Sequence, residues 1–305
     1  MCSSDLVATA QTYPARPVRV IVPSGAGGNN DVTTRGLAQA LADSLGQPFV
    51  VDNRGGAEGI IGAEACARAA PDGYTLCSTA INVMTFTPVL RRKLPYDTER
   101  DFSPVAHQGY LDAVIVAHPS LPATSVAELI ALAKAKPDAI SWATFGPNTS
   151  SFYYMEWLRR TRAAPFLHVP YKTSPQSHTA NIAGEVMVNL YGAGLAVAPI
   201  KAGKLRALAV TGDRRSVLLP DVPSFKEAGI DLPIRTWYGL FAPAGTPRDI
   251  VQRLNSETQR VMAQPGFVEK FLTAVGLSHP GAMTPEEFAA FLKRDRKSTR
   301  LNSSH

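Results

Sequence analysis

Apolar residues recur along this chain in two patterns, short runs rich in β-branched residues and longer stretches with a helical period. Residues 18–22 hold four β-branched side chains around Arg19, which predicts a short buried strand. A helix is predicted soon after it, because apolar residues recur at helical spacing over 37–45 and the Asn-Asn-Asp run at 29–31 can cap its start. The chain therefore opens with a strand–turn–helix unit.

The same kind of unit is repeated along the rest of the chain. Further strands are predicted at 47–53, 74–79, 111–117, 140–144, 186–191 and 205–211, with helices at 60–70, at 125–136, around Tyr153, Tyr154 and Trp157, and at 288–296. This repetition predicts an α/β fold with mostly parallel sheets, and the chain is long enough for two domains. Ligands of such sheets bind at the carboxyl ends of strands, so we expect the site in the turns that follow them.

The turn after the first strand holds three glycines within four positions, at Gly25, Gly27 and Gly28. A backbone without Cβ atoms can approach a ligand closely, and the N-terminus of a helix offers unpaired N–H groups to an anion. The turn is therefore either an anion site or a tight turn whose glycines serve packing alone. It matches neither the Walker loop nor the dinucleotide-binding fingerprint.

Composition and charge narrow the class of protein. The chain has 305 residues, of which 45% are hydrophobic and 18% charged, as in ordinary globular proteins. No apolar run is long enough to span a membrane. The formal net charge is +6, but the basic clusters at 91–93, 159–162 and 214–215 are scattered and are not interleaved with aromatic residues. The sequence therefore predicts no nucleic-acid partner.

The cysteine and histidine pattern predicts no metal site. Cys66 falls in a predicted helix and Cys77 in the next predicted strand. We expect both to be buried and reduced, because neither has a basic neighbour in sequence, although an exported location would permit a bridge between them. The histidines show no metal-ligand spacing. Neither a metal nor a cofactor is expected.

Both ends of the sequence differ from its body. The Ala-Thr-Ala run at 8–10 resembles a signal-peptide cleavage site, yet residues 1–7 lack the charged and apolar regions that precede such a site. Residues 297–305 lose the apolar period of the helix predicted to end at Arg296. We expect 1–7 and 297–305 to be non-native segments, with the native signal peptide missing from this sequence.

A set of short motifs occurs in a characteristic order along the chain. They are Tyr13-Pro14, Arg16-Pro17-Val18-Arg19, Gly27-Gly28 with Asp31 and Arg35, Leu45-Gly46-Gln47-Pro48, Asp52-Asn53-Arg54, Pro71-Asp72-Gly73-Tyr74, Leu94-Pro95-Tyr96-Asp97, Asp101-Phe102-Ser103-Pro104, His168-Val169-Pro170-Tyr171, Lys201-Ala202-Gly203-Lys204, Leu219-Pro220-Asp221-Val222-Pro223, Ala242-Pro243-Ala244-Gly245 and Thr284-Pro285-Glu286-Glu287. In this order they resemble the Bug family of periplasmic solute-binding proteins, the receptors of tripartite tricarboxylate transporters. The resemblance covers the chain from Tyr13 to about Arg296.

The resemblance implies a two-domain periplasmic-binding-protein fold of type II, hinged like a Venus flytrap. We expect one domain to comprise 11–112 and 236–296 and the other 113–235, with hinges near Asp112 and Arg235. Such a protein is an extracytoplasmic receptor that performs no chemistry. It captures a small organic carboxylate between its domains and presents it to the membrane permease subunits of the transporter. A monomer in the periplasm is expected.

The resemblance also implies the ligand-binding residues, in two strand-to-helix turns and a few neighbouring positions. A carboxylate would be held by backbone N–H groups and hydroxyls, without a dedicated arginine. The candidate residues are Ser24, Gly25, Ala26, Gly27, Gly28, Asn29, Asp31, Ala80, Asn82, Phe145, Gly146, Asn148, Thr149, Ser150, Ser151, Tyr171, Thr173, Met187 and Tyr191.

Several positions depart from the family pattern, and they suggest a pocket wider or more apolar than one for citrate. Ala180 and Met187 stand where acidic residues are usual, and Thr173 stands where glycine is usual. Aromatic and apolar residues gather near the expected pocket, although ordinary core packing explains any one of them as well. These residues are Phe145, Phe152, Tyr153, Tyr154, Met187 and Tyr191.

Two other functions remain as alternatives. The first is a hydrolase-like enzyme on an α/β scaffold, but the chain lacks the Gly-x-Ser-x-Gly elbow and has no histidine in a turn with evident Ser and Asp partners. Asp31 could be imagined as a base, but we expect it to cap the helix and order the glycine-rich loop. The second is a solute receptor that signals through a partner instead of supplying a permease, which the sequence cannot separate from transport.

Overall fold

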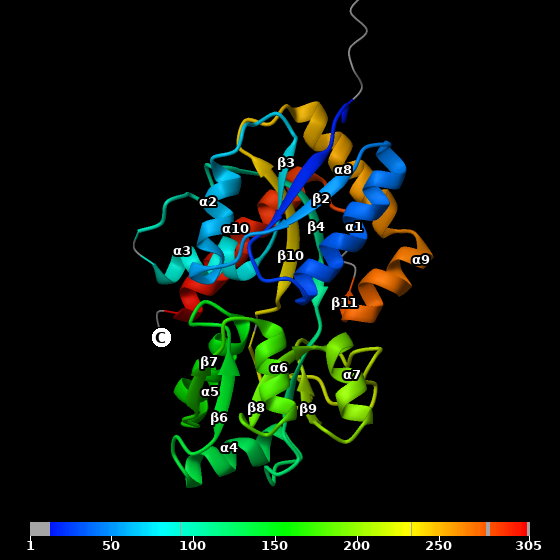
Figure 1. Ribbon diagram of the computed structural model, residues 1–305. Coiled ribbons are helices and arrows are strands. Elements are labelled where there is room, and N and C mark those ends of the chain that lie inside the picture. Colours follow the sequence, from blue (N-terminus) through cyan, green and yellow to red (C-terminus); the bar gives the residue numbers. More distant parts are fainter. Residues whose placement is uncertain (1–12, 92, 233, 279–280, 304–305) are drawn as a thin grey trace, which may run out of the picture.

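The computed structural model describes residues 13–91, 93–232, 234–278 and 281–303. These residues form two α/β domains, one above the other in Figure 1, and each is built around its own sheet. The two-domain α/β architecture predicted from the sequence is confirmed. Residues 1–7, predicted to be non-native, lie outside the described residues.

The upper sheet has six strands in the order β11-β4-β10-β3-β1-β2. Strand β1 pairs in parallel with β2 and β3, whereas β10 is antiparallel to β3 and β4, and β11 is antiparallel to β4. Their bounds are β1 Val18–Val22, β2 Phe49–Asn53, β3 Thr75–Ala80, β4 Phe102–Leu111, β10 Trp237–Pro243 and β11 Leu277–Ser278.

The lower sheet has five strands in the order β7-β6-β8-β5-β9. Strand β6 is parallel to β7 and β8, whereas β5 is antiparallel to β8 and β9. Both sheets are therefore mixed, and the expectation of mostly parallel sheets holds only for the strand–turn–helix repeats. The bounds are β5 Ala113–Ala117, β6 Ser141–Thr144, β7 Leu167–Pro170, β8 Val188–Gly192 and β9 Arg206–Val210.

The helices follow the strands in the alternating order that the sequence predicted. Those of the upper domain are α1 Asn29–Leu45, η1 Ala57–Gly59, α2 Ile60–Ala67, η2 Asn82–Phe86, α3 Thr87–Leu90, α8 Arg248–Met262, α9 Pro265–Phe267, η3 Val268–Leu272, η4 Thr273–Val275 and α10 Pro285–Ser303. Those of the lower domain are α4 Val126–Ala135, α5 Ser150–Arg162, α6 Ser174–Ile182 and α7 Ala193–Lys201.

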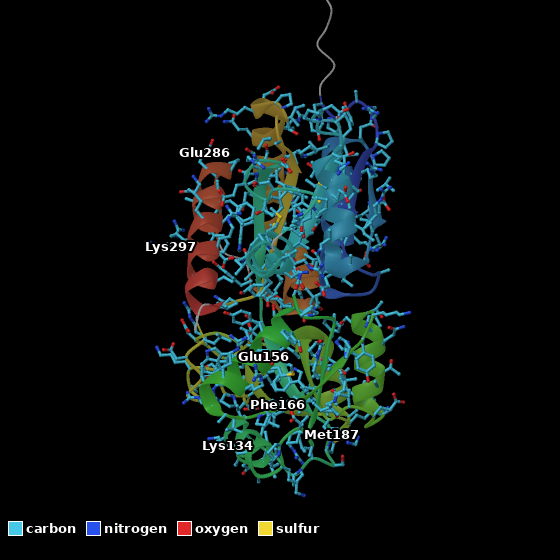
Figure 2. All side chains as sticks on the ribbon, turned by 90° about the vertical axis from the view of Figure 1, so that its left-hand side faces the viewer. Lys134, Glu156, Phe166, Met187, Glu286 and Lys297 are labelled. Atoms are coloured by element: carbon cyan, nitrogen blue, oxygen red, sulfur yellow. The ribbon has the colours of Figure 1, made fainter. Side chains whose placement is uncertain are left out.

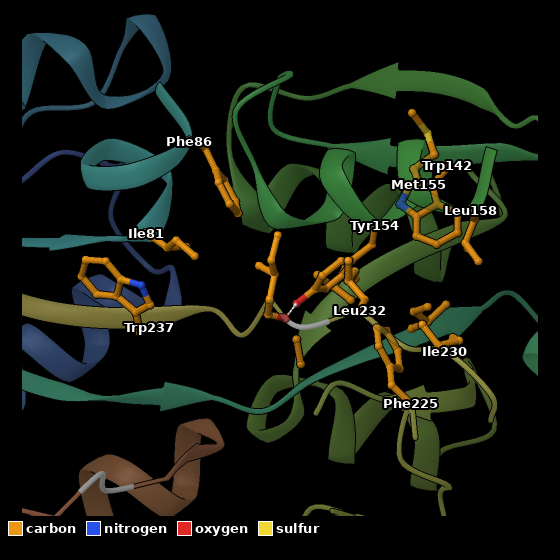
Figure 3. Packing of buried hydrophobic residues seen from close by; sticks show 14 of the residues in the cluster. Ile81, Phe86, Trp142, Tyr154, Met155, Leu158, Phe225, Ile230, Leu232 and Trp237 are labelled. Atoms are coloured by element: carbon orange, nitrogen blue, oxygen red, sulfur yellow. Dashed lines mark hydrogen bonds between the residues drawn. The ribbon is translucent and has the colours of Figure 1, made fainter. Parts of the chain in front are cut away.

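One large cluster of buried apolar side chains extends from the upper domain into the lower one. Figure 3 shows Trp237 at strand β10 and Phe86 at the end of the helical segment η2, with Trp142 and Tyr154 in the lower domain. The Tyr154 hydroxyl is buried and donates a hydrogen bond of 3.1 Å to the backbone carbonyl of Ile234, in the segment that returns to the upper sheet. This cluster therefore holds the connecting segment against the lower domain.

The chain crosses between the sheets at Asp112, which separates β4 from β5, and again just before β10. A side chain in each crossover contacts the other, since Arg235 Nη2 lies 3.5 Å from Asp112 Oδ1. The Arg235 guanidinium also stacks over the Tyr110 ring, 4.3 Å from its centroid. The two crossovers are thus adjacent, as a hinge requires. The hinge itself and the domain limits remain predictions.

Helix α10 runs past Arg296, where the sequence pattern predicted its end. The side chains of Leu292, Arg296 and Thr299 are all buried, so the packed face continues at helical spacing. The predicted end at Arg296 was wrong because the buried face continues with polar residues, which a search for apolar periodicity does not detect. The non-native origin of 297–305 remains a prediction.

Asp31 fixes the shape of the first glycine-rich turn. Its carboxylate accepts hydrogen bonds from Gly27 N–H (2.9 Å), Arg35 Nε (3.1 Å) and Asn53 Nδ2 (2.9 Å), and so joins the turn, α1 and the end of β2. The expectation that Asp31 caps α1 is wrong, because the N-cap is Gly28 and makes no side-chain cap hydrogen bond. Asp31 instead bonds backward to the loop that precedes the helix.

The charge on Asp31 should stabilise the fold. Burial raises the pKa of its carboxyl, but the hydrogen bonds from Gly27, Arg35 and Asn53 together outweigh burial and leave the pKa below its ordinary value. A carboxyl with a lowered pKa stabilises the native state above its unfolded-state pKa, and that contribution is lost as pH falls through the folded-state pKa.

We therefore expect Asp31→Asn to lower the free energy of unfolding near neutral pH by about 1–3 kcal/mol. The difference from wild type should shrink as pH falls below about 3.9, the ordinary pKa of aspartate. Denaturant unfolding at several pH values measures both effects. The matched control is Asp43→Asn on the exposed face of the same helix, which should change stability by less than about 0.5 kcal/mol. Equal effects of the two substitutions at neutral pH would contradict this role.

The two cysteines of the described chain are free and buried, as predicted. Cys66 belongs to α2 and Cys77 to β3, and both are completely inaccessible to solvent. Burial raises the pKa of the Cys77 thiol well above its ordinary value, and the neighbouring Cys66 thiol raises it further. The reactive thiolate form is therefore disfavoured.

We expect neither thiol to react with a thiol-specific reagent in the native protein, and both to react after unfolding without a reductant. The measurement is mass spectrometry of the alkylated protein in a Cys2→Ser background, because Cys2 lies outside the described residues. Recovery of a peptide in which Cys66 and Cys77 are bridged would show the prediction to be wrong.

Candidate functional site

A cavity of about 740 Å³ lies between the two domains. Strand-to-helix turns from both domains form its walls, three from the upper domain (after β1, β2 and β3) and three from the lower domain (after β6, β7 and β8). It therefore occupies the place that the sequence analysis selected, at the carboxyl ends of strands. The predicted residues that line it are Ser24, Gly25, Gly28, Asn29, Ala80, Asn82, Phe145, Gly146, Thr149, Ser150, Ser151, Tyr171, Thr173 and Tyr191.

Five predicted residues do not line the cavity. Ala26 and Gly27 belong to the glycine-rich turn but lie off its cavity side, and Asp31 is buried in the contacts that shape that turn. Asn148 is buried too, and its Nδ2 donates a hydrogen bond of 2.8 Å to Thr87 Oγ1 in the upper domain. These residues shape the site from behind or join the domains beside it.

Met187 is the fifth, and the structure places it far from the cavity. It directly precedes β8, whose carboxyl end at Gly192 lines the cavity, so it stands at the opposite edge of the sheet. Figure 2 shows Met187 low in the lower domain, away from the junction of the domains. The strand was predicted correctly, but the binding role was assigned to its wrong end.

Four helices of the two domains begin at the cavity. The N-cap residues of α1, α5, α6 and α7 are Gly28, Thr149, Thr173 and Gly192, and each lines it. Only in α5 does the N-cap side chain accept a hydrogen bond from the first turn. The first N–H group of α7, at Ala193, already donates to the Asp112 carbonyl at 2.7 Å. Helices α1, α5 and α6 therefore direct backbone N–H groups and the positive ends of their dipoles toward one volume, which favours a bound anion.

Two buried polar atoms of cavity-lining residues lack a hydrogen-bond partner among the described residues. They are the hydroxyl of Thr79 at the end of β3 and Oδ1 of Asn29 at the start of α1. Both atoms are buried from solvent, so neither faces the open cavity in this conformation.

The aromatic residues near the site divide into two groups. Phe145 and Tyr191 line the cavity, whereas Phe152, Tyr153 and Tyr154 pack with the apolar core. The sequence left core packing open as an alternative, and this is the role of Phe152, Tyr153 and Tyr154. The expectation of a wider apolar pocket rests on the first group alone.

Tyr191 is held rigidly at the cavity wall. Its ring stacks on His178 with centroids 3.7 Å apart, and its hydroxyl donates to the His178 backbone carbonyl at 3.0 Å. Burial lowers the pKa of His178 to about 4, so the imidazole is neutral at physiological pH. A neutral ring can pack against the tyrosine without placing a buried charge behind the site.

Several cavity-lining residues were missed by the sequence analysis. The turn 55–59 holds three glycines and follows a predicted strand, so the expectation that ligands bind after strand ends could have identified it. Ser174 and Gly192 could have been identified in the same way, because they lie just after β7 and at the end of β8. Thr236 and Tyr238 had no local signal, because they lie where the chain returns from the other domain.

The described residues offer no other chemistry at this site. They contain no group of three or more His, Cys, Asp or Glu side chains that could hold a metal ion. None of the helices in the described part of the chain is long and apolar enough to cross a membrane. The arrangement is suited to holding a small anion.

Comparisons with known proteins agree with this geometry. Residues 33–300 match the model of the tripartite tricarboxylate transporter family receptor. The solved structure of the periplasmic binding protein BugD is 30% identical, with a TM-score of 0.87 over 96% of this chain and 98% of BugD.

Two further solved structures contain ligands. MatC from Rhodopseudomonas palustris, with bound malate, is 30% identical, with a TM-score of 0.87 over 94% of this chain and 99% of MatC. The R. palustris protein Rpa4515, with adipate, is 28% identical, with a TM-score of 0.89 over 95% of this chain and 96% of that protein. These relatives are solute-binding proteins and not enzymes, which removes the hydrolase alternative. The chain belongs to the receptor family of the tripartite tricarboxylate transporters.

Proposed function

We propose that this protein is a periplasmic receptor that captures a small organic carboxylate in the cavity between its domains and presents it to the permease subunits of a tripartite tricarboxylate transporter. The observation that carries the proposal is the convergence of three helix N-termini on one cavity, α1 from the upper domain and α5 and α6 from the lower domain. Family membership supports the transporter partner, and the periplasmic location of BugD supports the compartment.

The cavity suits a carboxylate held by neutral donors. Of the described residues that line it, the only cationic one is Lys172, which is exposed to solvent. Backbone N–H groups are fixed in direction, so they can bind an anion at little entropic cost. Hydroxyls of Ser24, Ser150 and Thr173 add further donors around the same volume. The malate and adipate held by two relatives are carboxylates of suitable size.

Binding should appear first as stabilisation of the native state. A ligand that binds only the folded protein raises its stability by about 2.7 kcal/mol at a hundredfold excess over Kd. A thermal-shift screen of aliphatic mono- and dicarboxylates, aromatic acids and amino acids measures this, with calorimetry on the best compounds. Stabilisation by uncharged analogues alone, with no response to any carboxylate, would contradict the proposal.

Gly28→Val tests the position of the site. Gly28 lines the cavity with φ −81° and ψ 166°, so valine fits its backbone. An added Cβ would have only Gly25 O within 4 Å, at 3.9 Å, so the side chain would occupy the open cavity. We expect the affinity for the best carboxylate to fall at least tenfold, or by about 1.4 kcal/mol.

The matched control is Gly266→Val, at an exposed glycine where an added Cβ meets nothing within 4 Å. It should leave the calorimetric affinity unchanged. A folded Gly28→Val protein that binds at full strength would show that the site has been placed wrongly.

A further inference from the structure

Glu58 occupies an unusual backbone conformation at the edge of the cavity. It lies in the turn after β2 with φ 60° and ψ 29°, and Ala57 before it has φ 44°. The left-handed region is unfavourable for residues that carry a Cβ atom. Such a conformation persists only where the surroundings fix it, and it is often found at ligand sites.

The carboxylate of Glu58 extends from the upper domain to the lower one. Its Oε2 accepts a hydrogen bond from Arg91 Nη2 at 3.0 Å, and only 16% of the side chain is exposed. Its Oε1 faces Gly146, where an added Cβ would lie 3.1 Å away. No described residue donates a hydrogen bond to Oε1, so this oxygen can accept one from a ligand.

Glu58 gives one part of the cavity a negative charge. The charged residues among the described ones that line the cavity are Glu58 and Lys172, and Lys172 is exposed. Arg91 does not line it, and 45% of its side chain is exposed to solvent. A ligand beside this turn therefore meets the carboxylate and not its cationic partner.

The cavity is thus electrically polarised. The N-termini of α1, α5 and α6 attract a carboxylate, whereas Glu58 repels a second one and can only accept hydrogen bonds when ionised. Like charges brought together at an interface disfavour binding strongly, so a single carboxylate can decide between ligands of equal size.

We propose that Glu58 determines the specificity of this receptor, selecting a solute with one carboxylate and a hydrogen-bond-donating group, an ammonium above all, at the Glu58 end. Solutes that place a second carboxylate there are rejected. This inference rests on the proposed function, because it assumes that the first carboxylate binds at the helix N-termini.

The test uses probes matched in carbon skeleton and different only in the terminal group. One set is adipate, caproate and ε-aminocaproate; a second is succinate, butyrate and γ-aminobutyrate; a third is terephthalate, benzoate and para-aminobenzoate. Calorimetry gives, within each set, the ratio of the dicarboxylate Kd to the amino-carboxylate Kd. The variant is Glu58→Gln, which removes the charge and keeps the side-chain shape.

The matched control is Glu64→Gln, on the helix that follows the same turn. Glu64 is also paired with an arginine, Arg68, at 2.7 Å, but it does not line the cavity. In the set that binds, wild type and Glu64→Gln should prefer the amino carboxylate. Glu58→Gln should lower the Kd ratio by roughly tenfold or more. Thermal unfolding verifies that each variant is folded. If Glu58→Gln does not fold, Glu58→Gly replaces it, because glycine readily adopts the positive φ of this position.

The outcomes separate the two claims. Carboxylate binding with a Kd ratio that Glu58→Gln leaves unchanged would overturn the role of Glu58 and leave the proposed function intact. That result is expected if the Glu58–Arg91 pair is only structural. Failure of every probe to bind wild type and all variants would contradict the proposed function, and the inference would fall with it.

Discussion

The first N–H groups of a helix have no partner within the helix, and this constraint organises the junction of the two domains. Helix α1 of the upper domain and α5, α6 and α7 of the lower domain all begin at the same cavity. In α1 and α6 no N-cap side chain takes the place of an acceptor, whereas the first N–H of α7 donates to the Asp112 carbonyl. In the proposed function, a carboxylate that supplies the missing acceptor would bond to both domains at once, so binding would also favour closure at the predicted hinge.

Carboxylates near these helix ends are handled in two opposite ways. Asp31 is buried and accepts three hydrogen bonds, and these bonds fix the shape of the glycine-rich turn. Glu58 instead reaches the cavity wall with one oxygen paired to Arg91 and the other turned toward the opposite domain. In the account proposed here, the first carboxylate fixes the anion site without competing for it, and the second limits which groups the rest of the ligand can carry.

Much of this arrangement could be predicted from local sequence. The β-branched runs and glycine-rich turns located the strands and the starts of helices, and the family resemblance added 14 of the 33 described residues that line the cavity. Features that depend on the path of the chain could not be predicted in this way. Tyr238 reaches the site from the returning strand β10, Met187 lies at the distant end of β8, and α10 continues on a polar packed face. The left-handed backbone of Glu58 had no local signal, because glycine is the usual residue in such a conformation.

The central claim is that backbone N–H groups of helix N-termini from both domains hold the ligand carboxylate. A crystal structure of the complex with the tightest-binding carboxylate from the screen tests it most directly. The account predicts carboxylate oxygens about 2.7–3.2 Å from first-turn backbone nitrogens of α1 and of at least one of α5, α6 and α7. A carboxylate bound outside this cavity, or held there only by the Lys172 side chain, would contradict it.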